Sequence, residues 1–248
     1  MTISPHAVVH PEATLGADVV IGPFSVVGPG VLVGEGSRVG SHCVLGERGP
    51  GGQLPLHIAA GATIRSHAVV YGGSTFGSRL ETGHHTTLRE GLVVGDNLRV
   101  GSYADLQGDA AIGDHVRIHS NVFVAKGSIL EDLVWLFPHV VLTNDPHPPS
   151  DVEAGPTVGR AAAVGAGSLV LPGVRIGAGA LVAAGAVVAR DVPDGMLAVG
   201  VPAKATRRAS DLMHQTLGSA AYPWQRHFHR GYPDSVVREW AAEHGRRP

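Results

Sequence analysis

The chain has 248 residues, of which 44% are hydrophobic and only 5% aromatic, with 35 glycines and a formal net charge of −2. This composition allows one large domain or two small ones and favours a β-solenoid, with a core of small aliphatic side chains. It excludes binding of nucleic acid through a basic surface, and no apolar stretch reaches the roughly 18 residues of a membrane-spanning helix. The single cysteine, Cys43, cannot form an internal disulfide, so we expect a soluble, cytoplasmic protein.

A strict six-residue period begins near the N-terminus. Apolar residues, nearly all of them aliphatic, recur at every sixth position in three runs, over residues 3–45, 58–142 and 158–188, and Thr82 is the only polar member of the series. The residue four places later is usually small or β-branched, so both positions should point inward. Neither a helix nor an ordinary strand has this period. Each hexad therefore predicts one short strand and one corner. Three hexads close an 18-residue coil, and the coils stack about 4.8 Å apart.

Two insertions and a tail interrupt this all-β solenoid. Loops are expected over residues 46–57 and 143–157, and loops that leave a rigid scaffold often carry function. Beyond residue 205 the period is lost, and aromatic residues alternate with charged ones. We therefore predict a solenoid domain over residues 1–205 and a C-terminal helical extension over residues 206–248. The extension is expected to cap the open end of the solenoid, and a direct part in substrate binding is the alternative.

Residues 18 apart should stack, so the sequence predicts what each edge of the solenoid carries. One corner presents a polar ladder of His67, His85, Tyr103, Asn121 and His139, with His84 and His119 beside it. The next corner carries Tyr71, Arg89, Glu90, Gln107, Asp109, Lys126, Asn144 and Asp145. The third corner has the Gly, Asp and Asn residues of ordinary turns. In a homotrimer the two polar corners would meet in a cleft between subunits.

The hexad pattern of an aliphatic residue, glycine, two variable residues, a small residue and a variable one resembles the hexapeptide-repeat acyltransferases over residues 3–205. The resemblance implies a left-handed parallel β-helix. Residues 164–204 resemble the closing coils of members that use coenzyme A, and they end in Gly200-Val201-Pro202-Ala203-Lys204. Acetyl-CoA or another acyl-CoA is therefore the expected co-substrate, with acyl carrier protein as an alternative donor. Its pantetheine arm and phosphates are expected to contact Ala163, Gly165, Ala183, Lys204, Arg207 and Arg208.

Acyl transfer to an amine or hydroxyl needs a general base, and histidine titrates near neutral pH. His84 is the leading candidate because it follows Thr82, the one break in the core pattern. Relatives that acylate UDP-N-acetylglucosamine or amino sugars place a catalytic histidine at this phase of the hexad. His85, His119 and His147 remain alternative bases. A carboxylate could orient the imidazole, and Glu90 and Glu81 are the candidates.

The segment Thr143-Asn144-Asp145 resembles the Asn-Asp loop of N-acetyltransferases that act on nucleotide-linked amino sugars. The resemblance implies that Asn144 and Asp145 bind an amine acceptor. His147 is similar to the histidine of sugar O-acetyltransferases, so a hydroxyl acceptor is the alternative. The remaining residues expected to contact the acceptor are Arg89, His119, Asn121 and Lys126.

Two other functions compete on the same fold. γ-Type carbonic anhydrases bind a metal through three histidines, the last two of which lie five residues apart. The histidines of the polar corners lack that spacing, so we expect no required metal. A non-catalytic assembly platform is the other alternative. The sequence leaves open the acceptor, the acyl-chain length and the role of the extension.

Overall fold

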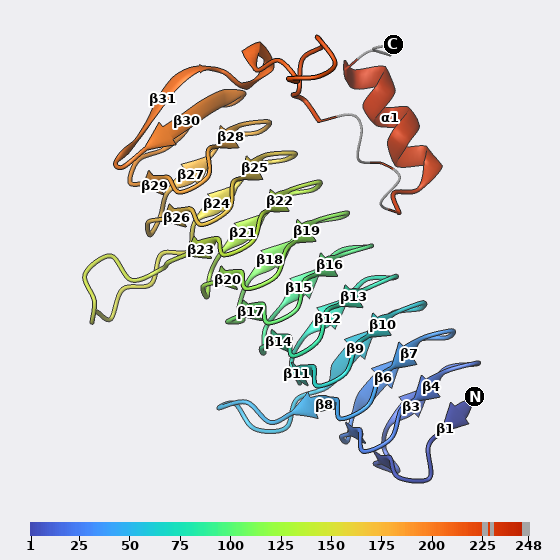
Figure 1. Ribbon diagram of the computed structural model, residues 1–248. Helices are drawn as coiled ribbons and strands as arrows, with labels where there is room; N and C mark the ends of the chain where they lie inside the picture. Colours follow the sequence, from blue (N-terminus) through green and yellow to red (C-terminus); the bar gives the residue numbers. More distant parts are fainter. Residues whose placement is uncertain (225–227, 229–230, 245–248) are drawn as a thin grey trace.

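The computed structural model describes residues 1–224, 228 and 231–244, which form a stack of short parallel strands followed by a C-terminal extension (Figure 1). The strands fall into three sheets of 12, 10 and 9 strands, here called sheets A, B and C. Successive coils pair in register at a spacing of 18 residues, as in Arg99 with Arg117 and Arg117 with Trp135. The predicted 18-residue coil is confirmed.

The strand bounds follow the hexad period. Sheet A contains β1 (Thr2–Ile3), β4 (Val20–Ile21), β7 (Arg38–Val39), β10 (Thr63–Ile64), β13 (Glu81–Thr82), β16 (Arg99–Val100), β19 (Arg117–Ile118), β22 (Trp135–Leu136), β25 (Ala163–Val164), β28 (Leu181–Val182), β30 (Met196–Gly200) and β31 (Ala203–Arg208). Sheet B contains β2 (Val8–Val9), β5 (Val26–Val27), β8 (Val44–Glu47), β11 (Val69–Tyr71), β14 (Thr87–Leu88), β17 (Asp105–Leu106), β20 (Phe123–Val124), β23 (Val141–Leu142), β26 (Leu169–Val170) and β29 (Val187–Val188). Sheet C contains β3 (Thr14–Leu15), β6 (Val31–Val33), β9 (Leu56–Ile58), β12 (Thr75–Phe76), β15 (Val93–Val94), β18 (Ala111–Ile112), β21 (Ile129–Leu130), β24 (Thr157–Val158) and β27 (Arg175–Ile176).

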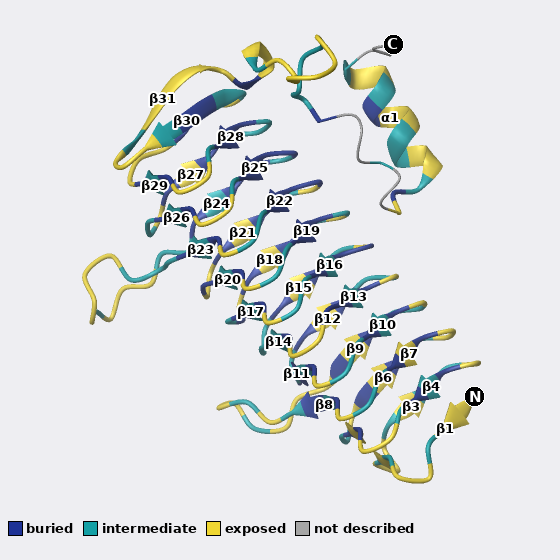
Figure 2. Cartoon of the chain, in the orientation of Figure 1, coloured by how far each residue is buried: buried dark blue, intermediate teal, exposed yellow. Residues whose placement is uncertain are grey.

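The core is the inside of the solenoid, where the aliphatic hexad positions stack (Figure 2). Cys43 is fully buried there, and burial raises the pKa of its thiol, as suits a structural side chain. Thr82, the polar exception, is also fully buried, and its Oγ1 accepts a hydrogen bond of 3.1 Å from the backbone N–H of Arg65. The hydroxyl is therefore satisfied without leaving the core.

The corner between sheets A and B requires a left-handed backbone at its third residue. His67, His85, Tyr103, Asn121 and His139 all have φ between 54° and 63°. Asn and His are among the residues most often found in this region. The polar ladder thus occupies one repeated turn position. In the N-terminal part of that column the aromatic rings stack continuously, with neighbouring centroids 4.5–5.3 Å apart. This ring ladder is formed by His6, Phe24, His42, His67, His85 and Tyr103.

Both insertions leave the corner between sheets B and C. The first connects β8 to β9 and the second connects β23 to β24, and Figure 1 shows them on the same side of the solenoid. The ring ladder lies at the corner between sheets A and B, on the opposite side of sheet B from the two insertions.

The extension begins as strands. β31 pairs antiparallel with β30, so the predicted boundary at residue 206 lies inside this hairpin. A 3₁₀ turn, η1 (Ala209–Asp211), and the helix α1 (Asp234–His244) follow, while residues 225–227, 229–230 and 245–248 lie outside the described part. A second apolar cluster joins the extension to the outward face of sheet A and contains Leu133, Trp135, Ala161, Ala163, Leu181, Leu197, Ala209, Trp224, Tyr232 and Trp240. The described part of the chain contains no helix that is long and apolar enough to cross a membrane.

Candidate active site

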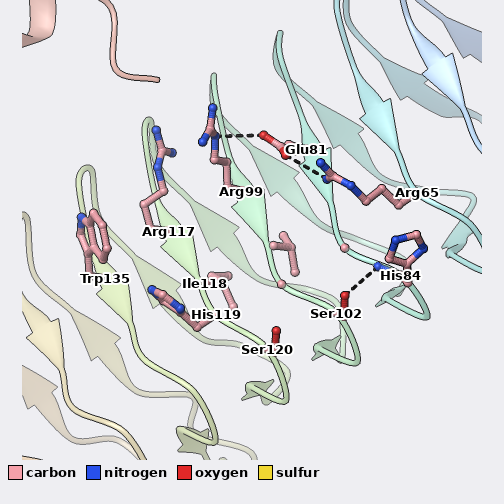
Figure 3. Close-up of a pocket in the computed structure, with 13 residues that line it drawn as sticks. Arg65, Glu81, His84, Arg99, Ser102, Arg117, Ile118, His119, Ser120 and Trp135 are labelled. Atoms are coloured by element: carbon pink, nitrogen blue, oxygen red, sulfur yellow. Dashed lines mark hydrogen bonds and ion pairs between the residues drawn. The ribbon is translucent and has the colours of Figure 1, made fainter. Parts of the chain in front are cut away.

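A cleft of about 360 Å³ lies on the outward face of sheet A, at its edge with the A–B corner (Figure 3). One wall of the cleft, here called the charged wall, consists of the outward-facing first residues of four stacked strands. These are Glu81 of β13, Arg99 of β16, Arg117 of β19 and Trp135 of β22. The opposite wall is the corner column of His84, Ser102 and Ser120. The 18-residue register therefore places residues of four coils around one space.

In two coils the floor between these walls is bare because Gly83 and Gly101 follow the inward residues, whereas His119 occupies this position in the next coil. A Cβ at Gly83 would collide with the backbone of Ser102, and a Cβ at Gly101 would collide with the backbone of Ser120. The close stacking of coils thus requires glycine at both positions. The same requirement leaves room for a ligand between the two columns of side chains.

Two serines hold His84 at the rim of the cleft. Ser66 Oγ lies 2.7 Å from His84 Nδ1, and the backbone N–H of His84 donates a hydrogen bond of 2.9 Å to Ser102 Oγ. When Nδ1–H donates to Ser66, Nε2 carries a lone pair and accepts a proton. That tautomer is the one a general base requires.

The charged wall is rich in arginine. Glu81 bridges two guanidinium groups, with its Oε1 2.9 Å from Arg65 Nη1 and its Oε2 3.1 Å from Arg99 Nε. Arg117 is only 4% exposed, and its Nη1 donates a 2.6 Å hydrogen bond to the backbone oxygen of Asn97. Burial lowers the pKa of Arg117 to about 10, so the group remains charged at neutral pH.

The described part of the extension contacts the same wall. The ring of Tyr232 lies over the guanidinium of Arg117 at 4.2 Å, and the Tyr232 hydroxyl accepts a 2.8 Å hydrogen bond from Trp135 Nε1. The backbone oxygen of Gly231 accepts a 3.0 Å hydrogen bond from Asn97 Nδ2. These contacts fix part of the cleft wall against a segment 97 to 134 residues away in sequence.

The other candidate bases lie in different settings. His119 lines the cleft and stacks on Phe137 at a centroid distance of 5.0 Å. His85 lies in the ring ladder, 4.5 Å from His67 and 5.0 Å from Tyr103. His147 is exposed in the second loop. Of the four histidines proposed from sequence, the cleft brings together His84 and His119.

The residues of the B–C corner form a separate group within one chain. Glu90 pairs with Arg89 at 3.0 Å. Although burial opposes ionisation of Glu90, its hydrogen bonds with Arg89 and its own backbone and the charges of Arg89 and Lys126 lower its pKa. Lys126 pairs with Asp109 at 3.3 Å and with Glu153 at 3.5 Å. In this chain Ser66, and not Glu90, hydrogen bonds to the His84 imidazole.

The second loop is ordered by Asp145. Its Oδ1 accepts a 2.7 Å hydrogen bond from Ser150 Oγ and one of 3.0 Å from the backbone N–H of His147. The bond from the Ser150 hydroxyl is the main cause that lowers the pKa of Asp145, which keeps the carboxylate ionised. The backbone oxygen of Asn144 accepts a 2.6 Å bond from the N–H of Ala154 at the base of the loop. Asn121 lies at the A–B corner next to Ser120, a cleft residue.

The residues proposed to bind the acyl donor lie in coils nearer the C-terminus. Ala163 is 2% exposed and packs in the cluster under the extension, and Ala183 packs against the same cluster. A Cβ at Gly165 would meet the backbone of Ala184 at 2.5 Å. The basic residues Lys204, Arg207 and Arg208 are exposed on β31.

Sequence reasoning found His84, Glu81 and His119 but missed Arg65, Ser66, Arg99, Arg117 and Trp135. The 18-residue spacing of the outward positions of sheet A would have revealed Arg99, Arg117 and Trp135, which stack on Glu81, and the same spacing places Ser66 one coil before His84. Within the described part of the chain, no group of three or more His, Cys, Asp or Glu side chains could hold a metal ion.

The comparisons with known proteins agree with this architecture. The profile of the family described as bacterial transferase hexapeptide (six repeats) matches residues 12–47 and 91–126. The structure of an Arabidopsis UDP-N-acetylglucosamine acyltransferase has a TM-score of 0.61 and 19% identity, over 83% of this chain and 74% of that one. A UDP-N-acetylglucosamine acyltransferase from Campylobacter jejuni has a TM-score of 0.55 and 18% identity, over 100% of this chain and 86% of that one. No curated protein sequence matches this chain significantly.

At these identities the two solved structures support the fold. The family profile adds the repeat that gives rise to that fold. The chain therefore contains the hexapeptide repeat of bacterial transferases over residues 12–47 and 91–126, and it has the left-handed parallel β-helix fold that its resemblance to the hexapeptide-repeat acyltransferases implies.

Proposed function

We propose that this protein transfers an acetyl or other short acyl group from acyl-CoA to the amine of a small acceptor, a nucleotide-linked amino sugar. The observation that carries the proposal is the placement of His84, whose imidazole is held by Ser66 at the rim of a cleft. The family contributes the reaction class. The Asn144-Asp145 loop favours an amine over a hydroxyl acceptor, and the single buried cysteine suits a reducing cytoplasm.

In this mechanism the acceptor nitrogen attacks the thioester carbon. A C–N bond forms, and the C–S bond then breaks. Nε2 of His84 takes the proton that the amine loses and returns it to the departing thiolate, so the products are the amide and free coenzyme A. A positioned general base of this kind typically contributes about 10²- to 10⁴-fold to the rate.

The proposed assembly is a homotrimer. Within one chain the His84 edge and the loop carrying Asn144 and Asp145 lie at opposite edges of sheet B. A neighbouring copy would supply the loop of one subunit to the cleft of the next. Sedimentation of the purified protein, with a mass of 25.6 kDa per chain, tests this arrangement directly.

The decisive assay follows thiol release from acetyl-CoA with a panel of nucleotide-linked amino sugars. We expect turnover with at least one of them, and a loss of about 10²- to 10⁴-fold in His84→Ala with acetyl-CoA binding retained. His67→Ala is the matched control. His67 lies in the ring ladder one coil away from His85, so this variant removes an imidazole from the same edge of the solenoid without removing a candidate base. A comparable loss in His85→Ala with an active His84→Ala would identify His85 as the base. An absence of acetyl-CoA binding in the wild type would overturn the acyltransferase proposal.

A further inference from the structure

The cleft beside His84 has an excess of positive charge that acyl transfer does not itself require. Its walls contain the guanidinium groups of Arg65, Arg99 and Arg117, and Glu81 is the carboxylate among the lining residues. The fixed charge of this set is therefore +2, from three arginines and one glutamate. Guanidinium groups bind phosphate oxygens through paired N–H donors, which favours phosphate as the ligand of an arginine-rich site.

Arg117 provides the second, independent observation. Its side chain lines the cleft and is 4% exposed, and its Nε and Nη2 have no hydrogen-bond partner among the described residues. Buried charged donors without partners are strongly unfavourable. Figure 3 shows the guanidinium groups of Arg99 and Arg117 side by side on the same side of the cleft. An anion there would satisfy donors from two adjacent coils.

The charge of the site selects among anions. A carboxylate carries one negative charge and would leave the set positive, whereas the diphosphate of a nucleotide conjugate carries two and would neutralise it. The adjacent strands β16 and β19 are also spaced at about 4.8 Å, which allows one arginine to reach each of two neighbouring phosphoryl groups.

We propose that Arg99 and Arg117 bind the diphosphate of a nucleotide in the His84 cleft. The proposal rests on the proposed function and specifies which part of a nucleotide substrate the cleft recognises. Glu81 is a positioning residue, since it holds Arg99 and Arg65 in place. Tyr232 has the same role for Arg117, because its ring packs on the guanidinium.

The test measures binding of inorganic pyrophosphate to the full-length protein by isothermal titration calorimetry, without any turnover. We expect saturable binding that weakens about 10- to 100-fold in Arg99→Gln, since charge-assisted hydrogen bonds are lost. Arg99 is partly exposed, so this variant should fold, which circular dichroism verifies. Arg175→Gln is the matched control, because Arg175 is a half-exposed arginine of sheet C that pairs with Glu131 at 3.5 Å. Its affinity for pyrophosphate should equal that of the wild type.

Equal affinities in the wild type and Arg99→Gln, or no binding to the wild type at millimolar pyrophosphate, would overturn the proposal. Two competitors then identify the source of the phosphate. Displacement of pyrophosphate by a nucleoside diphosphate but not by coenzyme A assigns the site to the acceptor, and the reverse assigns it to the donor. Pyrophosphate binding without turnover on any amino sugar would refute the proposed function alone, so the two failures are distinguishable.

Discussion

Replacing Ser66 with alanine removes the side-chain hydroxyl that contacts the His84 imidazole. The Oγ–Nδ1 distance is 2.7 Å, and the adjacent coil supplies the serine in register. When Nδ1–H donates to this hydroxyl, the imidazole is held in the tautomer that leaves Nε2 free to accept a proton. Ser66→Ala should therefore leave the fold intact and lower the rate of acyl transfer.

The size of the effect follows from the kind of hydrogen bond. A hydrogen bond between neutral groups contributes about 0.5–1.5 kcal/mol. At about 1.36 kcal/mol for each tenfold change in rate, its loss corresponds to a decrease of about twofold to tenfold in kcat/KM. We expect a value toward the lower end, because His84 is exposed and water can replace the serine hydroxyl.

The assay is thiol release from acetyl-CoA at saturating donor, with kcat/KM determined for the acceptor across pH 5–9. Ser66→Thr keeps a hydroxyl and should restore most of the activity. Ser41→Ala is the matched control, because Ser41 lies at the same corner position as Ser66 but one coil further from His84. An unchanged kcat/KM in Ser66→Ala, or an equal loss in Ser41→Ala, would refute the reasoning.

Two further predictions concern stability. Trp240 is 2% exposed, and its ring stacks on that of Trp224 at a centroid distance of 4.6 Å. Trp240→Ala should therefore lower the free energy of unfolding of the extension by about 3–5 kcal/mol, measured in urea titrations followed by tryptophan fluorescence. A loss below about 1 kcal/mol would contradict this packing. Hydrogen bonds from the backbone and hydroxyl of Ser78 lower the pKa of Asp96, so its stabilising effect is present above the unfolded pKa of about 3.9 and is lost as pH falls through the lower folded pKa. Asp96→Ala should therefore be less stable than the wild type at pH 7, with a difference that disappears in acid, and a difference that is independent of pH would argue against this role.

Most of the solenoid could be predicted from local sequence. An aliphatic residue at every sixth position can be buried only if each hexad turns one corner, and this condition determines both the strands and the 18-residue register. Thr82 drew attention to the coil that carries His84, because a polar group inside a repetitive apolar core must find a partner, and the structure shows that this partner is the backbone N–H of Arg65. The corner ladder was expected for the same reason of register.

The sequence by itself thus determined the coil, the register and the column that contains His84. Only the tertiary structure decided how the other side of the cleft is built. The extension has no period that relates it to a coil, yet it brings Tyr232 onto Arg117 and Trp135. The physical reason is that a repeat encodes contacts between residues 18 apart through backbone pairing. Contacts between residues 117 and 232 depend instead on side-chain packing, which no sequence spacing specifies.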